Sequence, residues 1–317
     1  MKKFLFPVLL MSTLVGLVAS ESMLRLKNRS MKNYDIEMWK YALHLKKVSE
    51  NQTLGHEHQP SKTALLQSVT VRTNEFGLRG APIDPSNDDH RRILFLGGSV
   101  TMGWGVPEER TLTELLKAKF TSQGKHVEVL NAGVGNFNAT RYVELFFTRL
   151  EKLQPSDIVV HFALRDAEIL IPANKNSLLR HSQLAATAWI TLTRYFGKFR
   201  DVSLEEHYTK VYEPDSQGLA EMKKSLQLLA HYCSTHNIRL YLAMFPDLHD
   251  LTEYKFTFIH DKMKKISTEL GYTYIDLYPA LRNLTPEEVW AMPGDPHPNA
   301  LGHQRMSETI FPVLALN

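Results

Sequence analysis

Short, continuous apolar runs recur along the chain from residue 92 onward. They cover residues 92–96, 126–130, 157–163, 238–245 and 272–278. A run that is apolar at nearly every position is typical of a strand buried on both faces. Amphipathic patterns with helical spacing follow these runs, over residues 108–120, 141–153, 217–231, 253–270 and 300–314. Strands that alternate with helices predict an α/β fold, a three-layer α/β/α sandwich with a mainly parallel central sheet.

The N-terminus has the pattern of a membrane-targeting segment. Met1-Lys2-Lys3 precedes an apolar run over residues 4–19. Lysines before a run of this length fit either a secretory signal peptide or a short signal anchor. Val18-Ala19-Ser20 offers small residues for cleavage, but the following residues 21–25 contain no Ala-x-Ala site. We therefore expect an exported protein on the periplasmic or extracellular side, either released or held at the membrane by this segment.

The chain of 317 residues divides into three predicted parts. Residues 1–25 form the signal peptide or anchor, residues 26–88 a polar N-terminal extension and linker, and residues 89–317 one α/β domain. An insertion at about 166–214 separates the third strand of that domain from its next helix. Residues 184–196 of the insertion carry a wide apolar face. We expect this face to pack on the domain, the alternatives being a cap over the active site or a membrane-facing patch.

Charge and ligand-type residues exclude several classes of function. The net charge is only +3, with no basic stripe, so nucleic-acid binding is not expected. Cys233 is the single cysteine and cannot form an intrachain disulfide. The 14 histidines include no His-Glu-x-x-His pattern. We expect neither a metal site nor a cofactor.

Ser99 is the first residue with a pattern that suggests catalysis. It follows the apolar run 92–96 and the pair Gly97-Gly98 directly, so it should project from the carboxyl edge of the sheet, where ligands bind in such folds. The residue spacing of this loop excludes two other kinds of site. Trp104 stands where a phosphate-binding loop needs its lysine, and Thr101 stands where the nucleophile elbow of α/β-hydrolases needs glycine.

Asp295-Pro296-His297-Pro298-Asn299 is the second such pattern. A residue before proline is driven toward extended conformations, and side chains two apart in a strand lie on the same side. Asp295 would then accept a hydrogen bond from His297 Nδ1 and leave Nε2 free to act as a base. A polyproline-like backbone would instead rotate the two side chains apart.

These stretches together resemble the SGNH/GDSL hydrolase family. Residues 93–101 are similar to its first block, residues 129–136 to its second, and residues 295–303 to its last. Residues 74–80 are similar to a lead-in of many exported members, so the resemblance covers roughly residues 70–317. It implies a flavodoxin-like SGNH hydrolase fold and a serine esterase.

The resemblance assigns roles to individual residues. Ser99 is the expected nucleophile, His297 its base and Asp295 the acid that orients the base. The oxyanion hole is expected to use the N–H of Ser99 and that of either Gly135 or Asn136, since the alignment is ambiguous by one residue.

Arg165 departs from the family pattern, because it occupies the position of an oxyanion-hole asparagine. Its guanidinium could stabilise the oxyanion or pair with Asp166 or Glu168 instead. The expected function is hydrolysis or transfer of an acyl group from a small-molecule or polysaccharide ester, with acetylated polysaccharides among the candidates. The alternative is a catalytically weakened envelope protein with a binding or assembly role.

Overall fold

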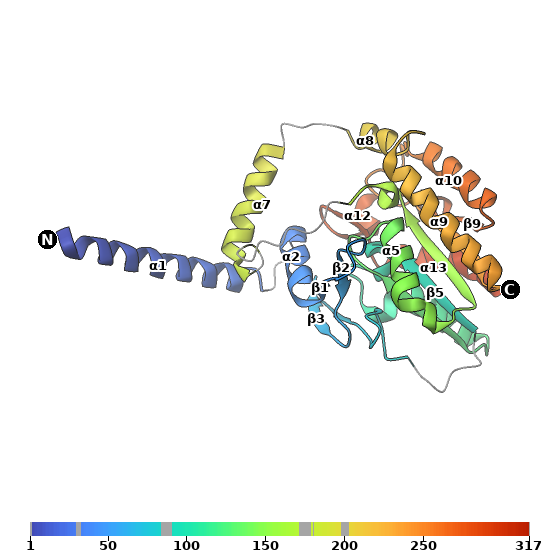
Figure 1. The fold of residues 1–317 in the computed structure, drawn as a ribbon, viewed down its shortest axis with the longest axis horizontal. Coiled ribbons are helices and arrows are strands. Elements are labelled where there is room, and N and C mark those ends of the chain that lie inside the picture. The colour runs from blue at the N-terminus through green and yellow to red at the C-terminus, as the bar shows by residue number, and fades with distance from the viewer. Residues whose placement is uncertain are drawn as a thin grey trace. The chain divides into compact units, whose positions relative to one another are not determined.

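The structure is a computed structural model that describes residues 2–29, 33–83, 91–170, 179, 181–197 and 203–316 (Figure 1). Its contacts divide the chain into two units. The first unit comprises Met1–His44 and Ala173–Asp201, and the second comprises Leu45–Pro172 and Val202–Asn317. Parts of the predicted linker and insertion, residues 84–90, 171–178 and 198–202, lie outside the described residues.

A five-stranded parallel sheet forms the centre of the second unit. Its strands are β5 (Arg91–Gly97), β6 (Val127–Gly133), β7 (Asp157–Ala163), β8 (Arg239–Phe245) and β9 (Thr273–Asp276). They are arranged in the order β6-β5-β7-β8-β9, and all four pairings are parallel. This is the strand order of flavodoxin-like folds, with the switch point between β5 and β7. The prediction of a parallel α/β sandwich is confirmed.

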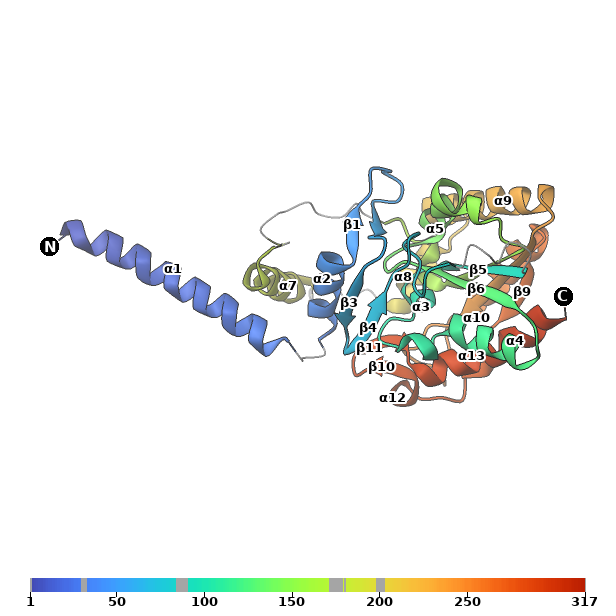
Figure 2. The ribbon, with the colours of Figure 1, turned by 90° about the horizontal axis from the view of Figure 1, so that it is seen from below.

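Helices cover both faces of the sheet, as the alternation of apolar runs and amphipathic patterns predicts (Figure 2). One face is covered by α5 (Ala139–Leu145), α9 (Gln217–Thr235) and α10 (Thr257–Glu269), the other by α4 (Leu112–Ser122) and α13 (Ala300–Ala315). Leu94 and Leu96 of β5 belong to the first core, and Ile93 and Phe95 to the second. This alternation with period two explains why β5 is apolar at successive positions.

Short elements connect these layers. They are η1 (Glu108–Arg110), η2 (Phe146–Leu150), η3 (Glu151–Leu153), η4 (Leu164–Ala167), α3 (Ser99–Met102), α8 (Leu204–Val211), α11 (Tyr278–Leu281), α12 (Pro286–Val289), β10 (Trp290–Met292) and β11 (Asp295–Pro298). The helix predicted over 141–153 is thus divided into α5, the π-helix η2 and the 3₁₀ turn η3. Helix α5 begins directly after Asn138, because the Asn138 side chain caps the helix by accepting a hydrogen bond from Arg141 N.

The polar lead-in forms two small hairpins. These consist of β1 (Lys46–Val48) with β2 (His56–His58), and β3 (Thr63–Leu66) with β4 (Val69–Arg72). Both belong to the second unit. Buried Arg79, just after them, donates hydrogen bonds to the carbonyls of Met102, Gly103 and Val106. The lead-in therefore holds the loop that follows Ser99, although the predicted boundary at residue 88 stays a prediction.

The first unit contains α1 (Lys2–Lys27), α2 (Tyr34–His44) and α7 (Gln183–Gly197). Glu21 of α1 accepts hydrogen bonds from the backbone N–H groups of Gln183 and Leu184, at the start of α7. Trp189 and Phe196 of α7 are more than half exposed. The packing of this face on the α/β domain stays a prediction.

Candidate active site

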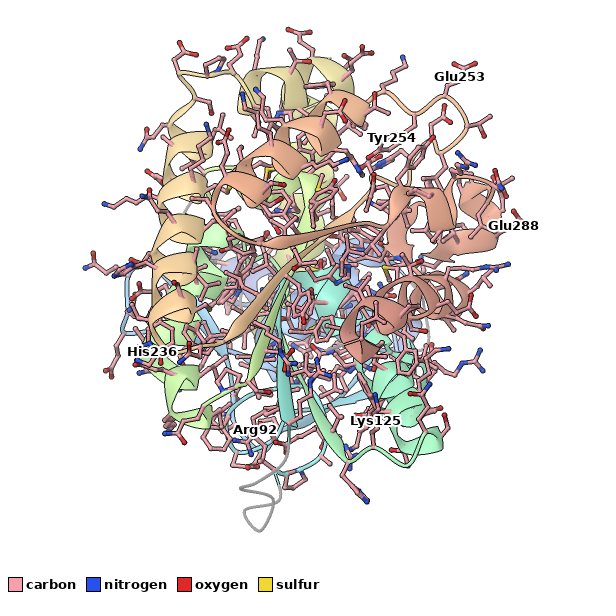
Figure 3. The ribbon with its side chains drawn as sticks, turned by 90° about the vertical axis from the view of Figure 1, so that its right-hand side faces the viewer. Arg92, Lys125, His236, Glu253, Tyr254 and Glu288 are labelled. Carbon is pink, nitrogen blue, oxygen red and sulfur yellow. The ribbon has the colours of Figure 1, made fainter. Side chains whose placement is uncertain are left out.

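Ser99 lies at the carboxyl end of β5, as its position after the apolar run predicts. It is partly exposed and begins α3. The chain passes tightly from strand to helix here, and this explains the glycine at position 97. A Cβ at Gly97 would lie 2.0 Å from Thr101 Oγ1 and 2.8 Å from the His161 carbonyl oxygen. In Figure 3, Arg92 and Lys125, at the amino ends of β5 and β6, lie in the lower part of the view, and Glu288 of α12 lies at its right-hand side.

Strand β11 brings His297 to Ser99. His297 Nε2 lies 2.7 Å from Ser99 Oγ, and His297 Nδ1 lies 2.5 Å from Asp295 Oδ1. Asp295–Pro298 pairs antiparallel with β10, so the backbone takes the extended conformation expected from the two prolines, not the polyproline-like alternative. The structure thus brings Ser99, His297 and Asp295 together in one chain of contacts, with the hydroxyl at one end and the carboxylate at the other.

Gln67 and Trp104 hold the carboxylate of Asp295, a role that their sequence context does not predict. The carboxylate is fully buried, and its Oδ2 accepts from Gln67 Nε2 at 2.9 Å and from Trp104 Nε1 at 3.2 Å. Burial raises the pKa of Asp295, but hydrogen bonds from His297 and Gln67 outweigh it and leave the pKa below its ordinary value. Asp295 is therefore held ionised beside the imidazole.

The candidate oxyanion donors include the backbone N–H groups of Ser99 and Asn136. The turn that follows β6 starts where Val134 N donates to the Gly97 carbonyl, and it closes where Phe137 N donates to Val134 O. Asn136 sits in this turn with a left-handed φ of 67°, a conformation that asparagine tolerates better than most residues other than glycine. Within the described residues, neither Ser99 N–H nor Asn136 N–H donates to a protein acceptor. Both remain available to an oxygen of a ligand.

Of the two alternatives in the second block, Asn136 is the more exposed. The Gly135 carbonyl accepts from His56 Nε2 at 2.9 Å, and Gly135 is buried. Asn136 is partly exposed.

Arg165 of η4 contacts the same turn. Its Nη2 donates to Asn136 Oδ1 at 3.0 Å and lies 3.8 Å from Glu168 Oε2, while its side chain is 39% exposed. Asp166, the other expected partner, is buried and accepts from Ala163 N. Arg165 thus pairs loosely with Glu168, and it also supports the residue that carries a candidate oxyanion donor.

Within the described residues, no group of three or more His, Cys, Asp and Glu side chains is placed to hold a metal ion. The chemistry available at this site is that of a serine hydroxyl, an imidazole, a buried carboxylate and two free backbone N–H groups.

A model of the GDSL-like lipase/acylhydrolase family matches residues 95–305, which contain both Ser99 and His297. The chain belongs to the GDSL-like lipase/acylhydrolase family. It is therefore a hydrolase that acts on ester bonds, as the resemblance predicts. No curated protein sequence matches this GDSL hydrolase.

Several solved structures are similar to this GDSL hydrolase. The psychrotrophic esterase EstA from Pseudoalteromonas sp. is 13% identical, over 71% of this chain and 99% of that chain, with a TM-score of 0.46. The lipase/acylhydrolase from Enterococcus faecalis is 15% identical, over 71% and 95%, with a TM-score of 0.43. A two-domain esterase active on acetylated mannans is 15% identical, over 72% and 49%, with a TM-score of 0.44. None of these likenesses bears on the substrate of this chain.

Proposed function

We propose that the chain is a serine esterase in which Ser99 is the nucleophile, His297 the general base and Asp295 the acid that orients it. The 2.7 Å contact between His297 Nε2 and Ser99 Oγ carries this proposal. A nucleophile within hydrogen-bond distance of a base, with the base held by a third group, is the arrangement that activates a serine.

In the first half-reaction, Ser99 Oγ attacks the ester carbonyl carbon while its proton passes to His297 Nε2. The carbonyl oxygen becomes an oxyanion that accepts from the N–H groups of Ser99 and Asn136. The tetrahedral intermediate then expels the alcohol, which takes the proton from His297. Arg165 adds positive charge beside Asn136 and holds its side chain.

In the second half-reaction, His297 removes a proton from water while the water oxygen attacks the acyl carbon. The bond between that carbon and Ser99 Oγ then breaks, the acid leaves, and Ser99 Oγ takes the proton back from His297. A sugar hydroxyl in place of water gives acyl transfer by the same steps. Acetylated polysaccharides, expected from the family resemblance, stay a prediction for the natural substrate.

Hydrolysis of a short p-nitrophenyl ester tests the assignment. Ser99→Ala and His297→Ala should each lower kcat by about 10⁴-fold or more. Ser122→Ala and His236→Ala, which change exposed residues of α4 and of the C-terminal end of α9, are matched controls that should keep the wild-type rate. Wild-type activity in either of the first two variants would refute the assignment.

We also propose that the enzyme is exported and that α1 meets the membrane. Phe6–Lys27 is long and apolar enough to cross a bilayer, and it is unburied in the structure. A signal sequence or an anchor has these properties alike. A reporter that is active only outside the cytoplasm, fused to the carboxyl end of the chain, should be active with residues 1–27 present and inactive without them. Equal reporter activity with and without these residues would refute export through this segment.

A further inference from the structure

Three basic side chains meet on the turn that carries Asn136. Arg165 donates to Asn136 Oδ1, Arg141 Nη1 donates to the Asn136 carbonyl at 3.3 Å, and His56 Nε2 bonds the Gly135 carbonyl. These residues come from η4, α5 and β2, which are separate in sequence. Of the three, only Arg165 stands in a motif of the sequence. Their convergence on two successive residues beside Ser99 is a property of the fold.

Positive charge accumulates at this turn. Burial, followed by the charges of Arg141 and Arg165, lowers the pKa of Lys46 to about 7. Burial, followed by the charge of Arg165, also lowers the pKa of Arg141. Burial lowers the pKa of His56 to about 2, so His56 is a neutral donor here. The charges of Arg141 and Arg165 therefore act on each other and on Lys46.

The carboxylates of the described residues compensate the charges of Arg141 and Arg165 only weakly. Arg141 is buried, and no carboxylate of the described residues contacts its guanidinium. The carboxylate nearest Arg165, that of Glu168, is 3.8 Å away and also contacts His207 at 3.0 Å. Arg165 Nε is buried and has no hydrogen-bond partner in the described structure. Burial of cations with so few anionic partners lowers the stability of the fold, and a bound anion would offset this cost.

We propose that Arg165, with Arg141 behind it, forms an anion subsite next to the oxyanion hole, so that the preferred substrates are acyl esters with a carboxylate, sulfate or phosphate close to the ester group. A guanidinium offers paired donors that match such oxyanions. Partly exposed Arg165 supplies the direct contact, and buried Arg141 supplies charge that solvent screens weakly. This inference rests on the proposed function, because it places the anion on a substrate bound at Ser99.

The competing explanation is that the cluster acts only on the oxyanion. In that case a change at Arg141 slows charged and neutral esters by the same factor. An anion subsite predicts a different result, because the charged ester alone loses an attraction in the ground state and in the transition state.

The experiment compares ester pairs that differ in charge. 3-Acetoxybenzoate and 3-acetoxybenzamide carry the difference on the alcohol side, and mono-p-nitrophenyl succinate and p-nitrophenyl butyrate carry it on the acyl side. For at least one pair, the wild type should favour the anionic ester by at least 10-fold in kcat/KM. Arg141→Gln, which keeps a donor for the Asn136 carbonyl, should lower this ratio by about 10-fold. The matched control Arg149→Gln changes an exposed arginine paired with Glu57 and should keep the ratio.

The subsite would be overturned if Arg141→Gln lowered kcat/KM by the same factor for both esters of a pair. It would also be overturned if the wild type favoured the neutral esters. A measurement on the wild type alone covers the case in which Arg141→Gln does not fold: benzoate should inhibit hydrolysis of p-nitrophenyl acetate at least 10-fold more tightly than benzamide, and equal inhibition would overturn the proposal. Failure of the proposed function looks different, because then no ester is hydrolysed in a manner that depends on Ser99.

Discussion

Gln67 Nε2 donates a hydrogen bond of 2.9 Å to Asp295 Oδ2, across 228 positions of the sequence. Gln67 lies in the turn between β3 and β4, with a left-handed φ of 48°. The hairpin of the lead-in therefore reaches into the candidate active site. It fixes the carboxylate that in turn fixes His297.

Gln67→Ala should lower kcat for a short ester by about 10-fold, with a smaller effect on KM. A hydrogen bond to a charged group contributes about 1.5–3 kcal/mol, and its loss leaves one oxygen of Asp295 with Trp104 as its remaining partner. Steady-state kinetics with p-nitrophenyl acetate measures the effect.

Gln154→Ala is the matched control for that variant. Gln154 has the same φ of 48° but is exposed and lies after η3, at the amino end of β7. Its replacement should leave kcat unchanged. Equal kcat values for Gln67→Ala and the wild type would show that the lead-in does not position Asp295.

The difference between Ser99 and Gln67 shows which parts of the site the sequence can predict. Ser99 follows an apolar run that is typical of a buried strand, so its place at the sheet edge follows from local pattern. Asp295 and His297 are two apart between prolines, and their relation is also local. Gln67 stands in a polar segment with short strands. Its contact depends on how a whole hairpin packs.

Arg141 illustrates a second limit. The pattern of its segment predicts a helix, and Arg141 lies in α5, but the helical pattern does not reveal that this arginine is buried against the Asn136 turn. Burial of a charged side chain is rare and depends on tertiary contacts. The fold class followed from periodicity, whereas the basic cluster required the structure.

Asn136→Gly and Asn136→Val should differ in activity by at least about 100-fold, with the glycine variant faster. Glycine adopts a φ of 67° freely, whereas a β-branched residue disfavours it strongly. Valine would shift the N–H proposed to bind the oxyanion, and loss of one such donor costs about 10²–10³ in kcat. Similar kcat values for the two folded variants would exclude the Asn136 N–H from the oxyanion hole.

Asp166 should make the protein less stable as pH rises. Burial raises the pKa of Asp166 to about 7, against about 3.9 in an unfolded chain. The folded state therefore binds the proton more tightly, and this contribution is complete below pH ~4 and is lost as pH rises through ~7. Across this pH range, the loss in the free energy of unfolding amounts to at most about 4 kcal/mol.

Urea unfolding at pH 5 and pH 8 measures this effect. Relative to the wild type, Asp166→Asn should gain stability at pH 8, because asparagine can still accept from Ala163 N without carrying charge. The control Asp261→Asn, at an exposed position of α10, should follow the wild type. A pH dependence of Asp166→Asn equal to that of the wild type would contradict the raised pKa.

Asp157→Asn should destabilise the fold by about 3–5 kcal/mol. Asp157 is fully buried at the start of β7, where Arg91 and Arg239 both bond its carboxylate. Removal of the negative charge takes away the carboxylate that both arginines bond. Urea unfolding at pH 7 measures the loss. Glu206→Gln breaks the exposed pair with Lys210 and should cost less than about 1 kcal/mol; equal losses in the two variants would refute the structural role of Asp157.

The central claim is that Ser99 is an activated nucleophile, and labelling with a fluorophosphonate probe tests it without knowledge of the natural ester. The account predicts that the wild type is labelled at Ser99, that His297→Ala is labelled far more slowly, and that Ser99→Ala is not labelled. A folded wild-type protein that resists the probe, or a Ser99→Ala variant labelled as fast as the wild type, would contradict the account.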